Sequence, residues 1–175
     1  MIKKYLSFVV CFFCINFAWS SISTGHTVNL VLEKMMPYHQ QELFGDEVYF
    51  DLAIHQKGQP TQYQRIPQKP FHWSIDKIQK QKETIIWSGQ LQEDNSFIIV
   101  ASLMESDASV LNPDELIGVV RLKLTKHDGK INVDWAMPNN ENFSMKTRGI
   151  KNESKKFVLK QGPTHYDIWL KLKEN

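Results

Sequence analysis

Cysteine is scarce in this chain, which has two cysteines, Cys11 and Cys14, in 175 residues. Two cysteines are too few for a disulfide-stabilised scaffold. An excess of one charge sign is also missing, because 21 basic side chains face 19 acidic ones and the formal net charge is +2. A protein that binds nucleic acid through bulk charge is therefore not expected. The sequence has no internal repeat and no proline- or glycine-rich linker, so it predicts one folded domain.

Sequence motifs for catalysis are absent as well. There is no Gly-x-Ser-x-Gly elbow and no glycine loop that cradles phosphate. None of the six histidines forms a His-x-His or His-x-x-x-His pair of the kind that binds zinc. We therefore expect a protein that is not an enzyme. A small hydrolase whose site is assembled from distant residues is the least favoured alternative.

The first twenty residues have the features of a secretory signal peptide. Lys3 and Lys4 precede the apolar run LSFVVCFFCINFAW, and the small residues Ala18 and Ser20 lie at its end, where a signal peptidase cleaves. The run is shorter than the roughly 20 apolar residues that a transmembrane helix needs. The two-lysine start is typical of bacterial exported proteins. We expect cleavage after Ser20 and export to the periplasm or the medium.

Removal of this segment changes the composition of the mature chain, 21–175. Both cysteines leave with residues 1–20, so no disulfide or thiol chemistry is expected. Lys3 and Lys4 also leave, and 19 basic residues then face 19 acidic ones. No second apolar run is long enough to span a membrane, so no transmembrane segment is expected after signal removal.

Alternation of apolar and polar residues dominates the mature chain. In segment 130–135, for example, Ile131, Val133 and Trp135 alternate with polar neighbours. Such a period of two predicts half-buried strands. Asp128-Gly129 predicts a tight hairpin turn, because glycine tolerates a positive φ. The segments that predict strands are 27–36, 47–55, 84–91, 97–105, 116–124, 130–135 and 165–173.

Helix is scarce in this pattern. Residues 74–83 predict one or two helical turns, and the polar residues 136–155 predict a long loop. Seven or eight short strands with regular turns predict an all-β fold, an antiparallel β-sandwich with little helix.

Four acidic residues occur in an order that is typical of a known family. Asp46 precedes a strand that carries aromatic residues, Glu105 and Asp107 end a buried strand, and Asp114 precedes an apolar-Gly step at Gly118. TVNLVLEKMMPYHQQELFGDEVYFDL contains Asp46, and FIIVASLMESDASVLNPDELIGVVRLKL contains the other three acids and Gly118. ETIIWSGQLQ matches a tryptophan that leads into a strand in the same family, and HYDIWLKLK closes the chain. The sequence resembles a C-two domain, the calcium-dependent lipid-binding sandwich. The closing strand resembles the family's circularly permuted form, which implies eight strands over 21–175.

The resemblance implies a calcium site made of Asp46, Glu105, Asp107 and Asp114. Residues 105 and 107 are two apart at a strand end and so project to the same side. Calcium binds six to eight oxygen atoms at about 2.3–2.6 Å, and converging carboxylates supply them. At Gln40 the sequence has a neutral residue where the family has its first-loop aspartate.

Two further features predict contacts with lipid or with a partner. Lys77, Lys80 and Lys82 form a basic cluster, and in this family a basic strand region can bind phosphoinositide headgroups. A solvated sheet edge is the alternative interpretation. Phe44 lies in the first loop, where an apolar side chain inserts into a membrane or a partner, or packs on the sandwich end.

The sequence as a whole predicts an exported, non-enzymatic binding domain that resembles a C-two domain. We expect it to engage membrane lipid or a protein partner through acidic loops, with calcium as the ion bound. The alternative is a metal-independent interaction β-sandwich of the periplasm or the medium, which Gln40 favours.

Overall fold

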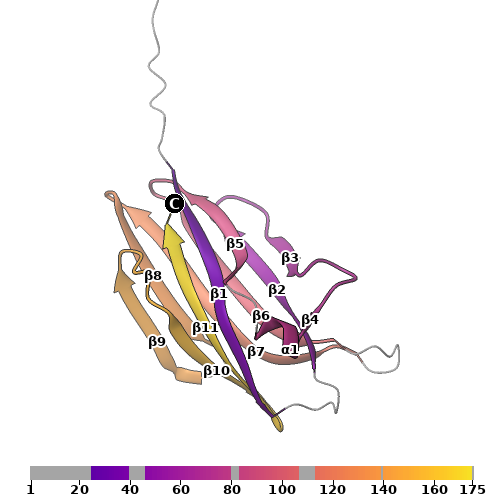
Figure 1. Ribbon diagram of the computed structural model, residues 1–175. Helices are drawn as coiled ribbons and strands as arrows, with labels where there is room; N and C mark the ends of the chain where they lie inside the picture. The colour runs from indigo at the N-terminus through magenta and orange to yellow at the C-terminus, as the bar shows by residue number, and fades with distance from the viewer. Residues whose placement is uncertain (1–24, 40–45, 80–82, 107–112, 139, 175) are drawn as a thin grey trace, which may run out of the picture.

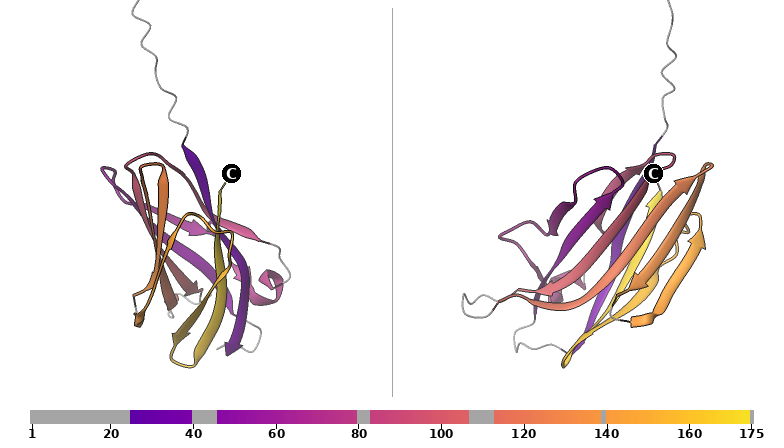
Figure 2. Two further views of the ribbon diagram at one scale, coloured as in Figure 1. Left: turned by 90° about the vertical axis from the view of Figure 1, so that its left-hand side faces the viewer. Right: turned by 180° about the vertical axis from the view of Figure 1, so that it is seen from behind.

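The computed structural model describes residues 25–39, 46–79, 83–106, 113–138 and 140–174. These residues form two antiparallel sheets that pack face to face as a β-sandwich (Figure 1, Figure 2). The prediction of an all-β antiparallel sandwich is therefore confirmed. The predicted signal peptide, residues 1–20, lies outside the described residues.

The smaller sheet has four strands in the order β10-β11-β1-β5. β1 (His26–His39) and β11 (Thr164–Glu174) are the two central strands, so the beginning and the end of the described chain pair with each other. β5 (Thr84–Leu91) and β10 (Lys155–Gln161) form the two edges.

The larger sheet follows the order β3-β2-β6-β7-β8-β9, with β4 paired to β2 beside this path. Its long central strands are β2 (Glu47–Gln56), β6 (Ser96–Glu105) and β7 (Glu115–His127). A four-residue helix, α1 (Ile75–Ile78), follows β4 directly. The remaining strands are β3 (Gln62–Ile66), β4 (Trp73–Ser74), β8 (Lys130–Met137) and β9 (Asn140–Arg148).

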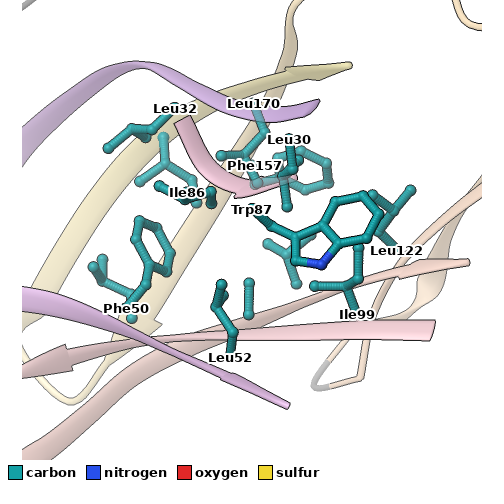
Figure 3. Close-up of a cluster of buried hydrophobic side chains, with 14 of the residues drawn as sticks. Leu30, Leu32, Phe50, Leu52, Ile86, Trp87, Ile99, Leu122, Phe157 and Leu170 are labelled. Carbon is teal, nitrogen blue, oxygen red and sulfur yellow. The ribbon is translucent and has the colours of Figure 1, made fainter. Parts of the chain in front are cut away.

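The core lies between the two sheets and consists of the side chains that alternate inward. Figure 3 shows Phe50 and Ile99 of the larger sheet facing Ile86 and Leu170 of the smaller one. Burying a side chain of this size stabilises the fold by about 1.5–3 kcal/mol. The apolar period of two in the sequence is thus the direct cause of the two-layer packing.

The Asp128-Gly129 hairpin is confirmed. Asp128 has a φ of 50° and Gly129 a φ of 68°, and they connect β7 to β8. Two consecutive positive φ values are typical of a type I′ turn, whose twist matches the twist of the paired strands. The other predicted strand segments also coincide with strands, namely β1, β2, β5, β6 and β11.

The loop predicted for residues 136–155 is wrong over much of its length. β9 occupies Asn140–Arg148 and pairs with β8. Phe143 and Met145 pack against the core, whereas the intervening Ser144 is exposed. Only two apolar side chains support this strand, because it is an edge strand. The periodicity also does not predict β3, β4 and β10, so the described residues form eleven strands in all.

Gly118 in β7 lies directly under the smaller sheet. A Cβ atom at this position would be 2.9 Å from Cβ of Leu159 in β10. Leu159 is buried, so it has little room to move. The absence of a side chain at residue 118 therefore lets the two sheets approach each other here.

Candidate functional site

Asp46 and Glu105 lie at the same end of the sandwich and are both buried, with 0% and 3% of their surface exposed. Glu105 continues the inward row of β6 after Leu103, and Val48 of β2 is its partner in register. Asp46 precedes β2 by one residue. The two carboxylates therefore extend the buried inner face of the larger sheet, and we call this end the acidic end.

Tyr166 of β11 reaches this end from the opposite sheet. Its hydroxyl donates a hydrogen bond to Oδ2 of Asp46. Burial, then this hydrogen bond, and then the negative charges of Asp46 and Glu105 raise the pKa of the Tyr166 phenol far above its usual value. The phenol therefore stays protonated and remains a donor to Asp46.

Asp114 lies at the same end but on the outer face of the larger sheet. Tyr49 projects to that face, because its neighbours Val48 and Phe50 are in the core. Its hydroxyl donates to Oδ2 of Asp114 over 2.7 Å. Arg65 of β3 lies 3.4 Å from the centroid of the Tyr49 ring, and its Nη1 is 3.7 Å from the same Asp114 oxygen.

The predicted calcium ligands are thus divided between two faces. Asp46 and Glu105 are brought together between the sheets, whereas Asp114 pairs with Tyr49 and Arg65 outside. Over the described ranges, these three carboxylates do not form a group whose oxygen atoms all lie within 4.8 Å of one another. Asp107 lies outside the described residues. The calcium site stays a prediction.

Only one of the four residues predicted to contact lipid or a partner lies within the described residues. Lys77 is exposed in the last turn of α1. Lys80, Lys82 and Phe44 lie outside the described residues. One exposed lysine does not form a basic cluster, so the described part of the chain adds no support for a headgroup site there.

The edge strand β3 and the segment that connects it to β4 carry the two most exposed large apolar side chains of the described residues. Tyr63 is 81% exposed and Phe71 is 68% exposed. Tyr63 also lines a surface groove of 500 Å³ together with Asp51, Arg65 and Ser102. The sequence does not predict this edge strand, because QYQRI has too little alternation of apolar and polar residues.

The outer face of the smaller sheet carries a buried carboxylate, Asp167, which is 2% exposed. Its Oδ2 forms an ion pair with Lys156, and its Oδ1 lies 3.3 Å from Nε2 of His165. Tyr38 stacks on His165 with a centroid distance of 4.7 Å. Burial raises the pKa of Asp167, but the hydrogen bonds from Lys156 and Tyr38, the charge of Lys156 and the hydrogen bond from His165 together outweigh it and hold the pKa below its usual value. The alternation of apolar residues in 165–173 predicts that Asp167 faces outward. It does not predict which side chains lie next to this carboxylate.

A third group of titratable side chains lies at the end opposite the acidic end. One ligand atom each from Glu93, Asp94 and His127 lie within 4.8 Å of one another. All three residues are exposed. Asp94 accepts a hydrogen bond from Nδ1 of His127 at 2.7 Å, which together with the Asp128 charge raises the pKa of His127. Only the register of β6 and β7 brings these two turns together, so no sequence motif predicts the group.

Within the described ranges, no helix is long and apolar enough to cross a membrane. No protein-family model matches the chain, and no curated protein matches it either.

Proposed function

We propose that this chain is an exported, non-enzymatic binding domain that docks a protein partner along the β3 edge without a metal ion. Its sequence resembles the circularly permuted form of a C-two domain, which has eight strands where the described residues form eleven. The observation that carries the proposal is the exposure of two aromatic side chains, Tyr63 in the edge strand β3 and Phe71 in the segment that follows it. Aromatic residues are enriched at the centres of protein interfaces, where a few of them supply most of the binding energy.

The strand β3 itself offers hydrogen-bonding groups to a partner. It pairs with β2 on one side and is the last strand of the sheet order. An extended segment of another protein can add to such an edge as a further strand. Asp51 and Arg65 in the adjoining groove supply charges of both signs that fix the register of that segment. The edge thus combines backbone pairing with side-chain recognition.

The contacts of Asp114 support docking that needs no calcium. Its carboxylate already accepts a hydrogen bond from Tyr49 and lies close to Arg65, so these groups neutralise it within the fold. A cation at this position would have to displace or repel the guanidinium group.

The test is capture of partners from the exported fraction of the native cell by the immobilised mature protein, with mass-spectrometric identification. We expect one partner that the wild type retains in EDTA and that the Tyr63→Ala/Phe71→Ala variant loses. Ile85→Ala is the matched control, because Ile85 is 56% exposed on the edge strand of the other sheet. Equal capture by the double variant, or loss of capture in EDTA, would contradict the proposal.

Calcium-dependent lipid binding is the second candidate function. The observation that favours it is the convergence of Asp46 and Glu105 on Tyr166 at one end. Its test is a calcium titration of the mature protein followed by thermal unfolding, and then sedimentation with anionic vesicles. Binding of calcium at a free concentration of 100 times the Kd adds about 2.7 kcal/mol to the free energy of unfolding. An unchanged melting temperature together with no vesicle binding would remove this candidate.

A further inference from the structure

The outer face of the larger sheet contains a groove of 430 Å³ over β7, β8 and β9. Asp134 in β8 pairs in register with Lys123 in β7 on one side and with Lys146 in β9 on the other. Arg148 lines the groove one step further along β9. Because side chains two residues apart share a face of a sheet, these groups all project into the same space. We call it the β8 groove.

Basic groups outnumber acidic ones in the β8 groove. Lys123, Lys146 and Arg148 are exposed, and in the described parts of the chain none of them has a carboxylate oxygen within 4.0 Å of its charged atoms. The single carboxylate, Asp134, is 3.7 Å from Nη2 of a fourth cation, Arg121. Among the described residues, three cations without a carboxylate partner thus converge on one concavity, and such a site attracts a multiply charged anion.

The remaining lining narrows the chemistry of the ligand. Thr125 and Asn132 add a hydroxyl and an amide, and no aromatic side chain of the described chain lines the groove. Base stacking on aromatic rings, which single-stranded nucleic acid uses, is therefore not offered here. The Asp134 carboxylate accepts hydrogen bonds but repels a bare anion. The lining thus suits a ligand that carries both anionic groups and hydroxyl donors.

We propose that the β8 groove binds a sugar that carries sulfate or phosphate groups. The anionic groups contact Lys123, Lys146 and Arg148, and a sugar hydroxyl donates to Asp134. The volume lies within the range of about 300–1,000 Å³ that small-ligand sites occupy. The inference does not depend on partner docking at β3, because β3 and β9 are the opposite edges of the same sheet. Either proposal can fail while the other stands.

The experiment measures binding of sucrose octasulfate to the mature protein by isothermal titration calorimetry. We compare the wild type with two double variants of equal charge change, Lys123→Gln/Lys146→Gln and Lys57→Gln/Lys160→Gln. Lys57 and Lys160 are exposed and lie away from the groove. Plain sucrose and sodium sulfate, at matched ionic strength, are the ligand controls, and phosphatidylglycerol vesicles test a membrane source of the anion. Thermal unfolding checks that each variant is folded.

We expect sucrose octasulfate to bind the wild type and the Lys57→Gln/Lys160→Gln control, with a loss of roughly tenfold in affinity for each groove cation removed. Plain sucrose should not bind. Absence of binding to the wild type, or equal losses in the two double variants, would overturn the proposal. Binding of sodium sulfate as tight as that of sucrose octasulfate would also overturn the proposal, because it would indicate a site for a bare anion. Binding to the vesicles but not to sucrose octasulfate would overturn it as well, because it would indicate a membrane surface as the ligand.

Discussion

Tyr166 and Asp46 form a hydrogen bond across the gap between the two sheets, at the end of the sandwich where Glu105 is also buried. The phenol comes from β11 of the smaller sheet and the carboxylate from the residue before β2 of the larger one. This hydrogen bond connects the two sheets at the acidic end, and removing it tests how much it contributes to the stability of the fold.

Tyr166→Phe should lower the free energy of unfolding by about 1–3 kcal/mol, because the variant takes one hydrogen-bond donor from a buried carboxylate. Urea denaturation measures the change. Tyr63→Phe is the control, since Tyr63 is exposed and its hydroxyl loss should change the stability by less than about 0.5 kcal/mol. Equal stabilities of wild type and Tyr166→Phe would mean that the link contributes nothing.

Gly118→Ala should destabilise the fold by about 1–3 kcal/mol, because the new methyl group overpacks against Leu159. The added Cβ atom would lie 2.9 Å from Cβ of Leu159, whereas at Gly25 the nearest atom is 3.6 Å away. Gly25→Ala is therefore the matched control and should remain as stable as the wild type. A Gly118→Ala variant with wild-type stability would show that the two sheets separate easily at this point.

His127 should titrate above its ordinary pKa of 6.5, because the hydrogen bond with Asp94 and the charge of Asp128 raise its pKa. A raised pKa in the folded state means that the stabilisation is fully present below 6.5 and is lost as the pH rises through the folded value. NMR titration of the imidazole carbons measures the pKa. Asp94→Asn should lower it, and the distant Asp51→Asn should not. A wild-type value of 6.5 or less would contradict the ion pair.

The Asp167–Lys156 pair should give the protein a pH-dependent stability on the acid side. Lys156 contributes to the lowered pKa of Asp167, so the stabilisation is present above the ordinary value of 3.8 and is lost as the pH falls through the lower, folded value. Asp167→Asn should cost about 1–3 kcal/mol at pH 7. Urea denaturation at pH 7 and in acid measures both. A cost that persists undiminished in strong acid would contradict the assignment to the ion pair.

The strands that could be predicted are those whose apolar side chains alternate over a long run. β11 is an example, since Ile168 and Leu170 face the core. β6 could be predicted on other grounds, because 97–105 is apolar at nearly every position. Edge strands such as β3 and β9 have fewer core residues, because an edge covers less of the opposite sheet. Their sequences therefore do not differ enough from those of loops.

The candidate sites show a similar limit. That Glu105 continues the inward row of β6 follows from its spacing to Leu103, and spacing alone places it at the strand end. The division between Asp46 inside and Asp114 outside could not be predicted, because Asp114 precedes its strand and its direction depends on Tyr49 and Arg65. The β8 groove also depends on the pairing of β9, in a region where the pattern predicts a loop.

The central position of β1 and β11 has a consequence for the order in which the fold can form. Val28 pairs in register with Glu174, so the first strand described needs the last one as its neighbour. A partial chain that emerges from the ribosome has β1 and β5 but no β11, and it cannot complete the smaller sheet. Contacts between such distant residues form slowly, since a long loop must close first. The smaller sheet is therefore completed only after β11 has been synthesised through Glu174.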